Sequence, residues 1–207
     1  MGTLLELLRS LLSLLFPLRD NAALVEETSF ENFSRLISPR QLTGSTVGLL
    51  PYRHRVIRSI ILEAKFNRNK KAISLLSGVL KDYIEGISED SAVLGNTTYV
   101  LVPVPLGADR QKKRGYNQVE EVCRATGLPV NAGLLERTRE TLPQTELKRG
   151  ARLENVRGAF AVAGTIDPSV TYVVVDDVTT TGATMQEVME TLTAAGSKSV
   201  KGVAFAY

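Results

Sequence analysis

The stretch "VVVDDVTTTGAT", Val173 to Thr184, joins a strand pattern to a helix pattern. Its apolar run lacks polar alternation, which is typical of a central strand of a parallel sheet buried on both faces. The run ends in Asp176 and Asp177, and threonines, a glycine and an alanine follow before helical periodicity begins. We therefore expect a strand over 171–176, a polar turn, and a helix over 184–195.

Strand and helix patterns alternate through the second half of the chain. Strands are expected at 98–104, 130–137, 158–162, 171–176 and 199–207, and helices at 117–126 and 184–195. This alternation predicts an α/β fold with a mostly parallel sheet covered on both faces. Ligands bind such sheets at the carboxyl ends of the strands, beside the switch in strand order. The two aspartates lie at such an end. A long polar loop, 137–157, separates two of the shorter strands.

The first half of the chain is predicted to be mainly helical. Residues 18–50 show weak periodicity and indicate an irregular linker with short helices, and helical stripes follow from residue 55 and through 72–83. We divide the chain into residues 1–97, an N-terminal amphipathic helix, linker and helical hood region, and residues 98–207, the α/β domain.

The N-terminal segment "TLLELLRSLLSLLF" is predicted to be an amphipathic helix rather than a signal peptide. Glu6 and Arg9 interrupt its leucines, and no basic region precedes it. The helix is too short and too charged to span a bilayer, and its polar face is not basic, which disfavours the membrane surface. We expect it to contact the rest of the protein or a partner.

Charge and cysteine content narrow the class of protein. Of the 207 residues, 25 are Lys or Arg and 22 Asp or Glu, and the segment 109–157 holds 11 basic and 7 acidic residues. This placement suits a segment that meets phosphates, although a solvated charged surface explains it equally well. The single cysteine, Cys123, excludes an internal disulfide and a cysteine-based zinc cluster. It suits a reducing compartment, so we expect a cytoplasmic protein.

The turn after Asp177 has the chemistry of a phosphate cradle. A helix N-terminus offers unpaired N–H groups and a positive dipole end, and threonine hydroxyls add donors. The two carboxylates would repel a polyphosphate but would suit sugar hydroxyls, so the pattern fits a pentose 5-phosphate. Neither a P-loop nor a dinucleotide turn is present. A plain helix cap is the alternative, but one residue would suffice for it.

Four separated motifs resemble the ComF-like competence proteins, a family of type I phosphoribosyltransferases. They are "YRHRVIRSIILEAKF" (52–66), "VPVPL" with "RGYNQ" (102–118), "LPQTELKRGARLENVRGAF" (142–160) and "VVVDDVTTTGAT" (173–184). The resemblance covers roughly residues 52–207. It implies a Rossmann-like parallel sheet with a mobile loop and a helical N-terminal hood region, and binding of phosphoribosyl pyrophosphate (PRPP). It also implies a cytoplasmic part in DNA uptake, with single-stranded DNA and a competence helicase as partners.

The resemblance also implies roles for individual residues. Asp176 and Asp177 would hold the ribose hydroxyls and serve catalysis, and the turn would hold the 5-phosphate. The turn comprises Thr179, Thr180, Thr181, Gly182, Ala183 and Thr184. Arg114 and Gly115 would lie in the pyrophosphate loop. The mobile loop would contain Gln144, Arg149, Arg152 and Asn155. Mg²⁺ would arrive with PRPP, held by ligand oxygens and water rather than directly by the protein.

The sequence departs from the family in one respect. Members commonly carry a four-cysteine zinc module directly after the N-terminal helix, but "LLFPLRDNAALVEETSF" contains no cysteine. Any partner or DNA contact made by that module is therefore in doubt here.

Three functions remain open at this point. The first is a phosphoribosyltransferase (a pentosyltransferase) that moves ribose 5-phosphate from PRPP to an unidentified acceptor. The second is a non-catalytic PRPP sensor that binds single-stranded DNA through basic residues such as Arg110 to Arg114, which equally suit a solvated or pyrophosphate-facing loop. The third is an adaptor acting through its N-terminal helix. His54 is expected at the surface and Cys123 in packing.

Overall fold

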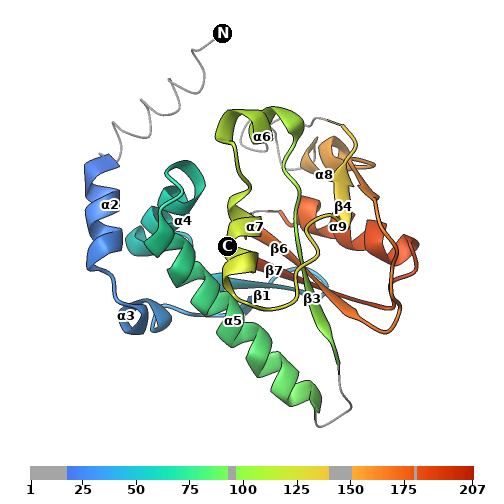
Figure 1. Ribbon diagram of the computed structural model, residues 1–207, viewed down its shortest axis with the longest axis horizontal. Helices are drawn as coiled ribbons and strands as arrows, with labels where there is room; N and C mark the ends of the chain where they lie inside the picture. The colour runs from blue at the N-terminus through green and yellow to red at the C-terminus, as the bar shows by residue number, and fades with distance from the viewer. Residues whose placement is uncertain (1–17, 93–96, 140–150, 180) are drawn as a thin grey trace.

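The computed structural model describes residues 18–92, 97–139, 151–179 and 181–207. These residues form a five-stranded sheet with helices on both faces and a separate two-stranded sheet (Figure 1). The helices are α2 (Leu18–Glu27), α3 (Phe30–Ser34), α4 (Arg55–Phe66), α5 (Lys70–Ala92), α6 (Ala108–Arg114), α7 (Gln118–Ala125), α8 (Ala151–Val156) and α9 (Ala183–Ala194). The strands are β1 (Arg40–Gln41), β2 (Thr46–Leu50), β3 (Tyr99–Pro103), β4 (Leu135–Arg137), β5 (Phe160–Val162), β6 (Thr171–Val178) and β7 (Ser199–Ala206).

The main sheet is mostly parallel and has the strand order β1-β2-β7-β6-β3. Strands β2, β7, β6 and β3 run parallel, and only β1 pairs antiparallel, with β2. Strand β6 is an interior strand, because Val174 aligns with Val102 of β3 on one side and with Gly202 of β7 on the other. The predicted α/β fold with a parallel sheet is therefore confirmed.

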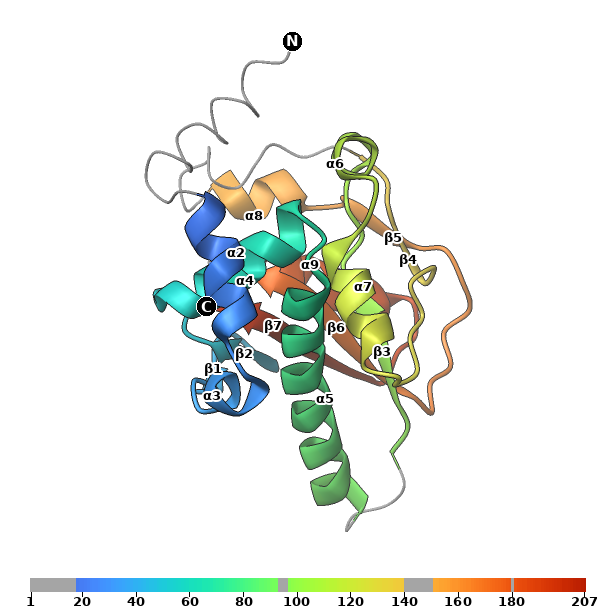
Figure 2. The ribbon, with the colours of Figure 1, turned by 60° about the vertical axis from the view of Figure 1, so that its left-hand side comes forward.

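Both faces of the sheet are buried, which explains why β6 shows no polar alternation. On one face Val173 and Val175 pack in a core cluster with α4, α5 and α7, the helices in front of the sheet in Figure 2. On the other face Tyr172 and Val174 pack in a second cluster with α9 and the β4–β5 pair.

The connections after β3 and β6 leave the sheet on opposite faces. Strand β3 leads through α6 to α7 on one face, whereas β6 leads directly to α9 on the other. The carboxyl ends of these neighbouring strands therefore flank a switch in strand order, where open parallel sheets bind their ligands.

Gly202 allows α9 to lie close to the sheet. A Cβ atom at this position would lie 2.6 Å from Oγ1 of Thr46 and 2.9 Å from Cγ of Met185, which is closer than a real contact allows. Because Gly202 has no side chain, the first turn of α9 can lie close to β7. This close packing holds the N-terminus of α9 beside the end of β6.

The expected central strands and the helices of both halves are confirmed, but shorter elements differ. Residues 46–50 form a strand, β2, within the expected linker, since parallel pairing with β7 outweighs their weak pattern. Of residues 130–137 only 135–137 form a strand, which pairs antiparallel with β5 outside the main sheet. Helices α6 and α8 form where loops were expected.

The division of the chain at residue 97 stays a prediction. One core cluster draws residues from both sides of that boundary, for example Leu49 and Ile60 with Leu101 and Val173. The N-terminal amphipathic helix over residues 3–16 lies outside the described residues. Within the described ranges, no helix combines the length and the hydropathy needed to cross a bilayer.

Cys123 and His54 lie where the sequence predicts them. Cys123 is fully buried in the cluster of α4, α5 and α7, where burial raises the pKa of its thiol, so its packing role is confirmed. His54 is exposed at the N-cap of α4, so its surface position is confirmed.

Candidate functional site

The two aspartates lie together at the carboxyl end of β6, next to the switch in strand order. Because side chains alternate along a strand, Asp177 shares the face of Val173 and Val175, which is covered by α4 and α7. Asp176 shares the opposite face with Val174. The backbone N–H of Asp177 donates to Oδ1 of Asp176 at 2.8 Å, which links the pair.

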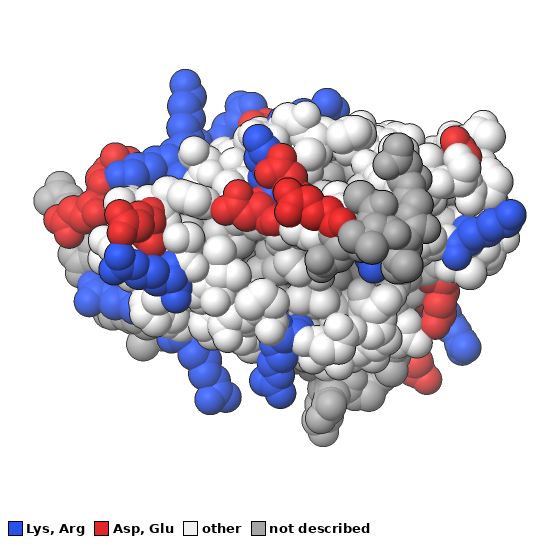
Figure 3. Space-filling model, turned by 90° about the horizontal axis from the view of Figure 1, so that it is seen from below, with Lys and Arg blue, Asp and Glu red and all other residues white. Residues whose placement is uncertain are grey.

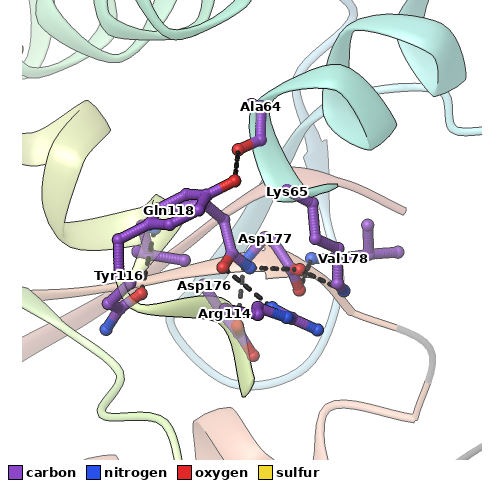
Figure 4. Close-up of polar contacts among 10 residues, drawn as sticks. Ala64, Lys65, Arg114, Tyr116, Gln118, Asp176, Asp177 and Val178 are labelled. Atoms are coloured by element: carbon purple, nitrogen blue, oxygen red, sulfur yellow. Dashed lines mark hydrogen bonds and ion pairs between the residues drawn. The ribbon is translucent and has the colours of Figure 1, made fainter. Parts of the chain in front are cut away.

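Asp177 is held by groups from three elements (Figure 4). Nζ of Lys65, near the end of α4, lies 2.6 Å from its Oδ2, and Nε2 of Gln118 donates to the same oxygen at 2.8 Å. The N–H of Val178 donates to Oδ1 at 2.7 Å. The side chains of Lys65 and Asp177 are only 25% and 14% exposed, so this ion pair is largely shielded from water.

Gln118 connects Asp177 to Arg114. Its Oε1 accepts a hydrogen bond from Nη1 of Arg114 at 2.9 Å, while its amide nitrogen donates to Asp177. The guanidinium of Arg114 also lies over the ring of Phe66, 5.4 Å from its centroid. The structure therefore brings the predicted pyrophosphate residue Arg114 to the aspartates through one side chain.

Tyr116 fixes the end of α4 against the "RGYNQ" segment. Its hydroxyl donates to the carbonyl of Ala64 and accepts from the N–H of Arg68, each at 2.9 Å. Arg68 has a φ of 48°, a left-handed backbone that a residue with a side chain seldom adopts. Its guanidinium pairs with Glu121 at 2.7 Å and lies over the Tyr116 ring. These contacts hold the corner after α4 and so direct Lys65 toward Asp177.

The pKa values of the two carboxyl groups are shifted in opposite directions. Burial, and next the neighbouring charge of Asp177, raise the pKa of Asp176 to about 7, against the opposing effects of Lys65 and Arg137. Burial would also raise the pKa of Asp177, but the charge and hydrogen bond of Lys65 and the N–H of Val178 hold it below its usual value. The environment of Asp177 therefore favours its ionised form, whereas that of Asp176 favours its protonated form.

The turn after the aspartates has a buried, unused hydroxyl. Oγ1 of Thr181 is inaccessible to solvent and has no hydrogen-bond partner among the described residues. Gly182, with a φ of 77°, forms the N-cap of the twelve-residue helix α9, and no side chain caps it. Ala183 and Thr184 begin the helix, Thr179 donates its N–H to Ala206, and Thr180 lies outside the described residues.

The other predicted residues are only partly described. Gly115 ends α6 with a φ of 77° beside Arg114. Gln144 and Arg149 lie outside the described residues, and Arg152 belongs to α8 without a described side chain. Asn155 also lies in α8, which packs against α9.

Comparison with known proteins identifies the family, although no family model matches the chain. Over 139 residues, 67% of the chain, it is 34% identical to the competence protein ComFC of Streptococcus pneumoniae, of which the alignment covers 56%. It is 32% identical over 107 residues, 49% of the chain, to the competence protein F of Haemophilus influenzae, of which 47% is covered. The chain belongs to the ComF/YhgH competence protein family.

The chain is also similar to a further curated relative and to solved structures. The DNA utilization protein YhgH of Escherichia coli is 29% identical over 146 residues, covering 69% of the chain and 63% of that protein. The chain thus spans about half to two thirds of these curated relatives. Among solved structures, adenine phosphoribosyltransferase from Leishmania tarentolae resembles it with a TM-score of 0.43 and 16% identity, over 80% of this chain and 79% of that one.

Three polar residues around Asp177 in this ComF/YhgH protein were not predicted from the sequence. Lys65 and Tyr116 stand in motifs that carry the family resemblance, but nothing in their spacing marks them as neighbours of Asp177. Gln118 does leave a signal in the sequence, since its spacing places it on the helix face of Val119, Val122 and Cys123, and the structure buries it there to 4% exposure. A buried amide needs a partner, and here Asp177 supplies it.

The raised pKa of Asp176 predicts how stability depends on pH. Because the folded protein holds this proton above the unfolded pKa of about 4, the contribution of Asp176 is present at acid pH and is lost as pH rises through 7. Asp176→Asn removes this pH-dependent loss of stability, because asparagine has no carboxyl group to ionise. We expect its stability relative to wild type to increase by about 1–3 kcal/mol between pH 5.5 and 8.5 in urea unfolding. The control, Asp82→Asn on the exposed side of α5, should show no such increase. A stability difference between Asp176→Asn and wild type that stays constant with pH would contradict the assignment.

Proposed function

We propose that this ComF/YhgH protein binds PRPP together with Mg²⁺ and transfers its ribose 5-phosphate to an acceptor, with release of pyrophosphate. The observation that carries the proposal is the juxtaposition at the end of β6 of an acid pair and an unpaired hydroxyl at a helix N-terminus. A buried hydroxyl without a partner costs stability, so its presence favours a ligand that completes its hydrogen bonding.

The two ends of the site suit the two ends of a pentose phosphate. Thr181 and the N–H groups that open α9 are donors for the 5-phosphate, and the positive dipole end of the helix favours its charge. Asp176 and Asp177 are acceptors for the 2- and 3-hydroxyls. Arg114, already bonded to Gln118, is the nearest predicted ligand for the pyrophosphate.

The same residues suit the chemistry of transfer. When the bond from C1 to the pyrophosphate oxygen breaks, positive charge develops on the sugar, and the negative charge of Asp177, joined by that of Asp176 when it is ionised, would stabilise it. Arg114 would stabilise the departing anion while the acceptor forms the new bond to C1. The acceptor's chemical class stays open.

Mg²⁺ fits this site mainly as a companion of the ligand. In the described part of the chain, no three His, Cys, Asp or Glu side chains gather to form a metal cage. The ion would therefore be held by pyrophosphate and sugar oxygens and by water, with Asp176 the carboxylate that lacks a described ion pair. When bound, it would neutralise pyrophosphate charge.

A binding experiment on Thr181 tests the proposal. Thr181→Val keeps the shape of the side chain but removes the hydroxyl, so we expect the affinity for Mg·PRPP to fall about tenfold or more. The unliganded variant should be as stable as wild type or more stable, because a buried unsatisfied group is removed. Calorimetric titration and urea unfolding measure the two effects.

The matched control is Thr193→Val, on the same helix. Its hydroxyl is exposed and donates to the carbonyl of Met189, so the affinity for Mg·PRPP should not change. The proposal fails if wild type does not bind Mg·PRPP, or if Thr181→Val binds it as tightly as wild type.

A second candidate function is binding of single-stranded DNA, as a sensor or carrier in DNA uptake. Lys112 and Lys113 are exposed on α6, and Arg110 and Arg114 flank them. The face of the molecule turned away from α6 differs, since acidic and basic side chains are interspersed there with uncharged surface (Figure 3). In this second function the protein would act in the cytoplasm with a competence helicase. Its N-terminal helix would contact a partner.

The salt dependence of binding tests this second function. If Lys112 and Lys113 contact phosphates, Lys112→Gln/Lys113→Gln should weaken binding of an oligothymidylate and reduce the log–log salt slope by about 1.4. The control, Lys198→Gln/Lys201→Gln, removes the same charge at the start of β7, at the other end of the sheet. An equal slope in both variants, or no binding of wild type at low salt, would exclude α6 as a DNA contact.

A further inference from the structure

Both carboxylate oxygens of Asp177 already accept hydrogen bonds, and Oδ2 accepts two. Its Oδ2 accepts both the ammonium of Lys65 at 2.6 Å and the amide of Gln118 at 2.8 Å, while Oδ1 accepts the N–H of Val178. A diol that binds Asp177 through Oδ2 has to replace at least one of these donors. Lys65 is the stronger of the two, because its hydrogen bond is assisted by charge.

The position of Lys65 is set by the protein rather than by chance. The hydroxyl of Tyr116 bonds both Ala64 and Arg68, on either side of Lys65 in the chain. The left-handed backbone of Arg68 and its ion pair with Glu121 hold the same corner. Strained backbone persists only where surrounding contacts maintain it, and here they maintain the direction of Lys65.

Displacing Lys65 has different consequences for different ligands. A neutral hydroxyl that takes the place of the ammonium leaves a positive charge that is only 25% exposed without its partner. Losing the partner of a shielded charge is strongly unfavourable. A ligand with an anionic group beside the same hydroxyls avoids this loss, because the ammonium exchanges one oxygen anion for another. Gln118 keeps the hydrogen bond that its Oε1 accepts from Arg114 in either case.

We propose that Lys65 is a specificity-determining residue that occupies Asp177 until a ligand with an anionic group beside its vicinal hydroxyls gives the ammonium a new partner. This inference rests on the proposed function and deepens it, since it assigns to one side chain the preference for PRPP over ribose 5-phosphate. Both ligands carry the 5-phosphate and the diol, and only PRPP carries the pyrophosphate at C1.

Titration of both ligands against Lys65 variants tests the inference. In wild type Mg·PRPP should bind much more tightly than ribose 5-phosphate. Lys65→Met removes the competitor and the anion partner together, so Mg·PRPP should bind more weakly and ribose 5-phosphate equally well or better. The preference for Mg·PRPP, which is the dissociation constant of ribose 5-phosphate divided by that of Mg·PRPP, should fall about tenfold. This is the effect of one charge-assisted hydrogen bond. Lys65→Arg should retain most of the wild-type preference.

The control variant is Lys81→Met on α5, which removes one positive charge from an exposed pair with Glu85 and should leave the ratio unchanged. If Lys65→Met does not fold, as judged by circular dichroism, Lys65→Gln takes its place with the same expectation. A wild-type protein that prefers Mg·PRPP, combined with an unchanged ratio in the Lys65 variant, overturns this inference alone. A wild-type protein that binds neither ligand overturns the proposed function as well.

Discussion

The charge of Asp177 is the constraint on which the rest of the site depends. Its side chain is 14% exposed at the end of a central strand, and a carboxylate in such a place is tolerated only when it is paired and hydrogen-bonded. Lys65 supplies the charge and Gln118 the hydrogen bond, so one carboxylate ties α4 and α7 to β6. Removing either the acid or the lysine would leave its partner uncompensated.

The other polar groups of the site come from the turn before α9 and from α6. Gly202 lets α9 lie close to the sheet, so the helix begins directly beyond the acids, with the hydroxyl of Thr181 buried in the turn. Because β3 and β6 send their connections to opposite faces, Arg114 reaches the aspartates from the other side of the switch point. The ends of β6, α4 and α6 thus bring together the carboxylate of Asp177, the ammonium of Lys65 and the guanidinium of Arg114. Such an arrangement suits a ligand that carries both hydroxyls and phosphates.

The features that are local in sequence could be predicted, and those that depend on distant packing could not. The acid pair and the glycine-containing turn were visible because strand, acids and helix start follow one another within "VVVDDVTTTGAT". Lys65 lies 112 residues from Asp177 in the chain, and only the pairing of strands and the packing of α4 bring the two together. Strand β2 escaped prediction for the same reason, because its stability comes from β7 rather than from its own residues. The buried amide of Gln118 was a signal that sequence alone could have offered.

A crystal structure of the protein with Mg·PRPP would show whether the acid pair and the turn before α9 bind the ribose 5-phosphate. We expect sugar hydroxyl oxygens about 3 Å from the carboxylates of Asp176 and Asp177, with the 5-phosphate on the N–H groups of residues 181–184. We also expect Nζ of Lys65 to leave Asp177 for an oxygen of the pyrophosphate. A ligand bound elsewhere on the protein, with the acid pair untouched and the turn before α9 empty, would contradict this proposal.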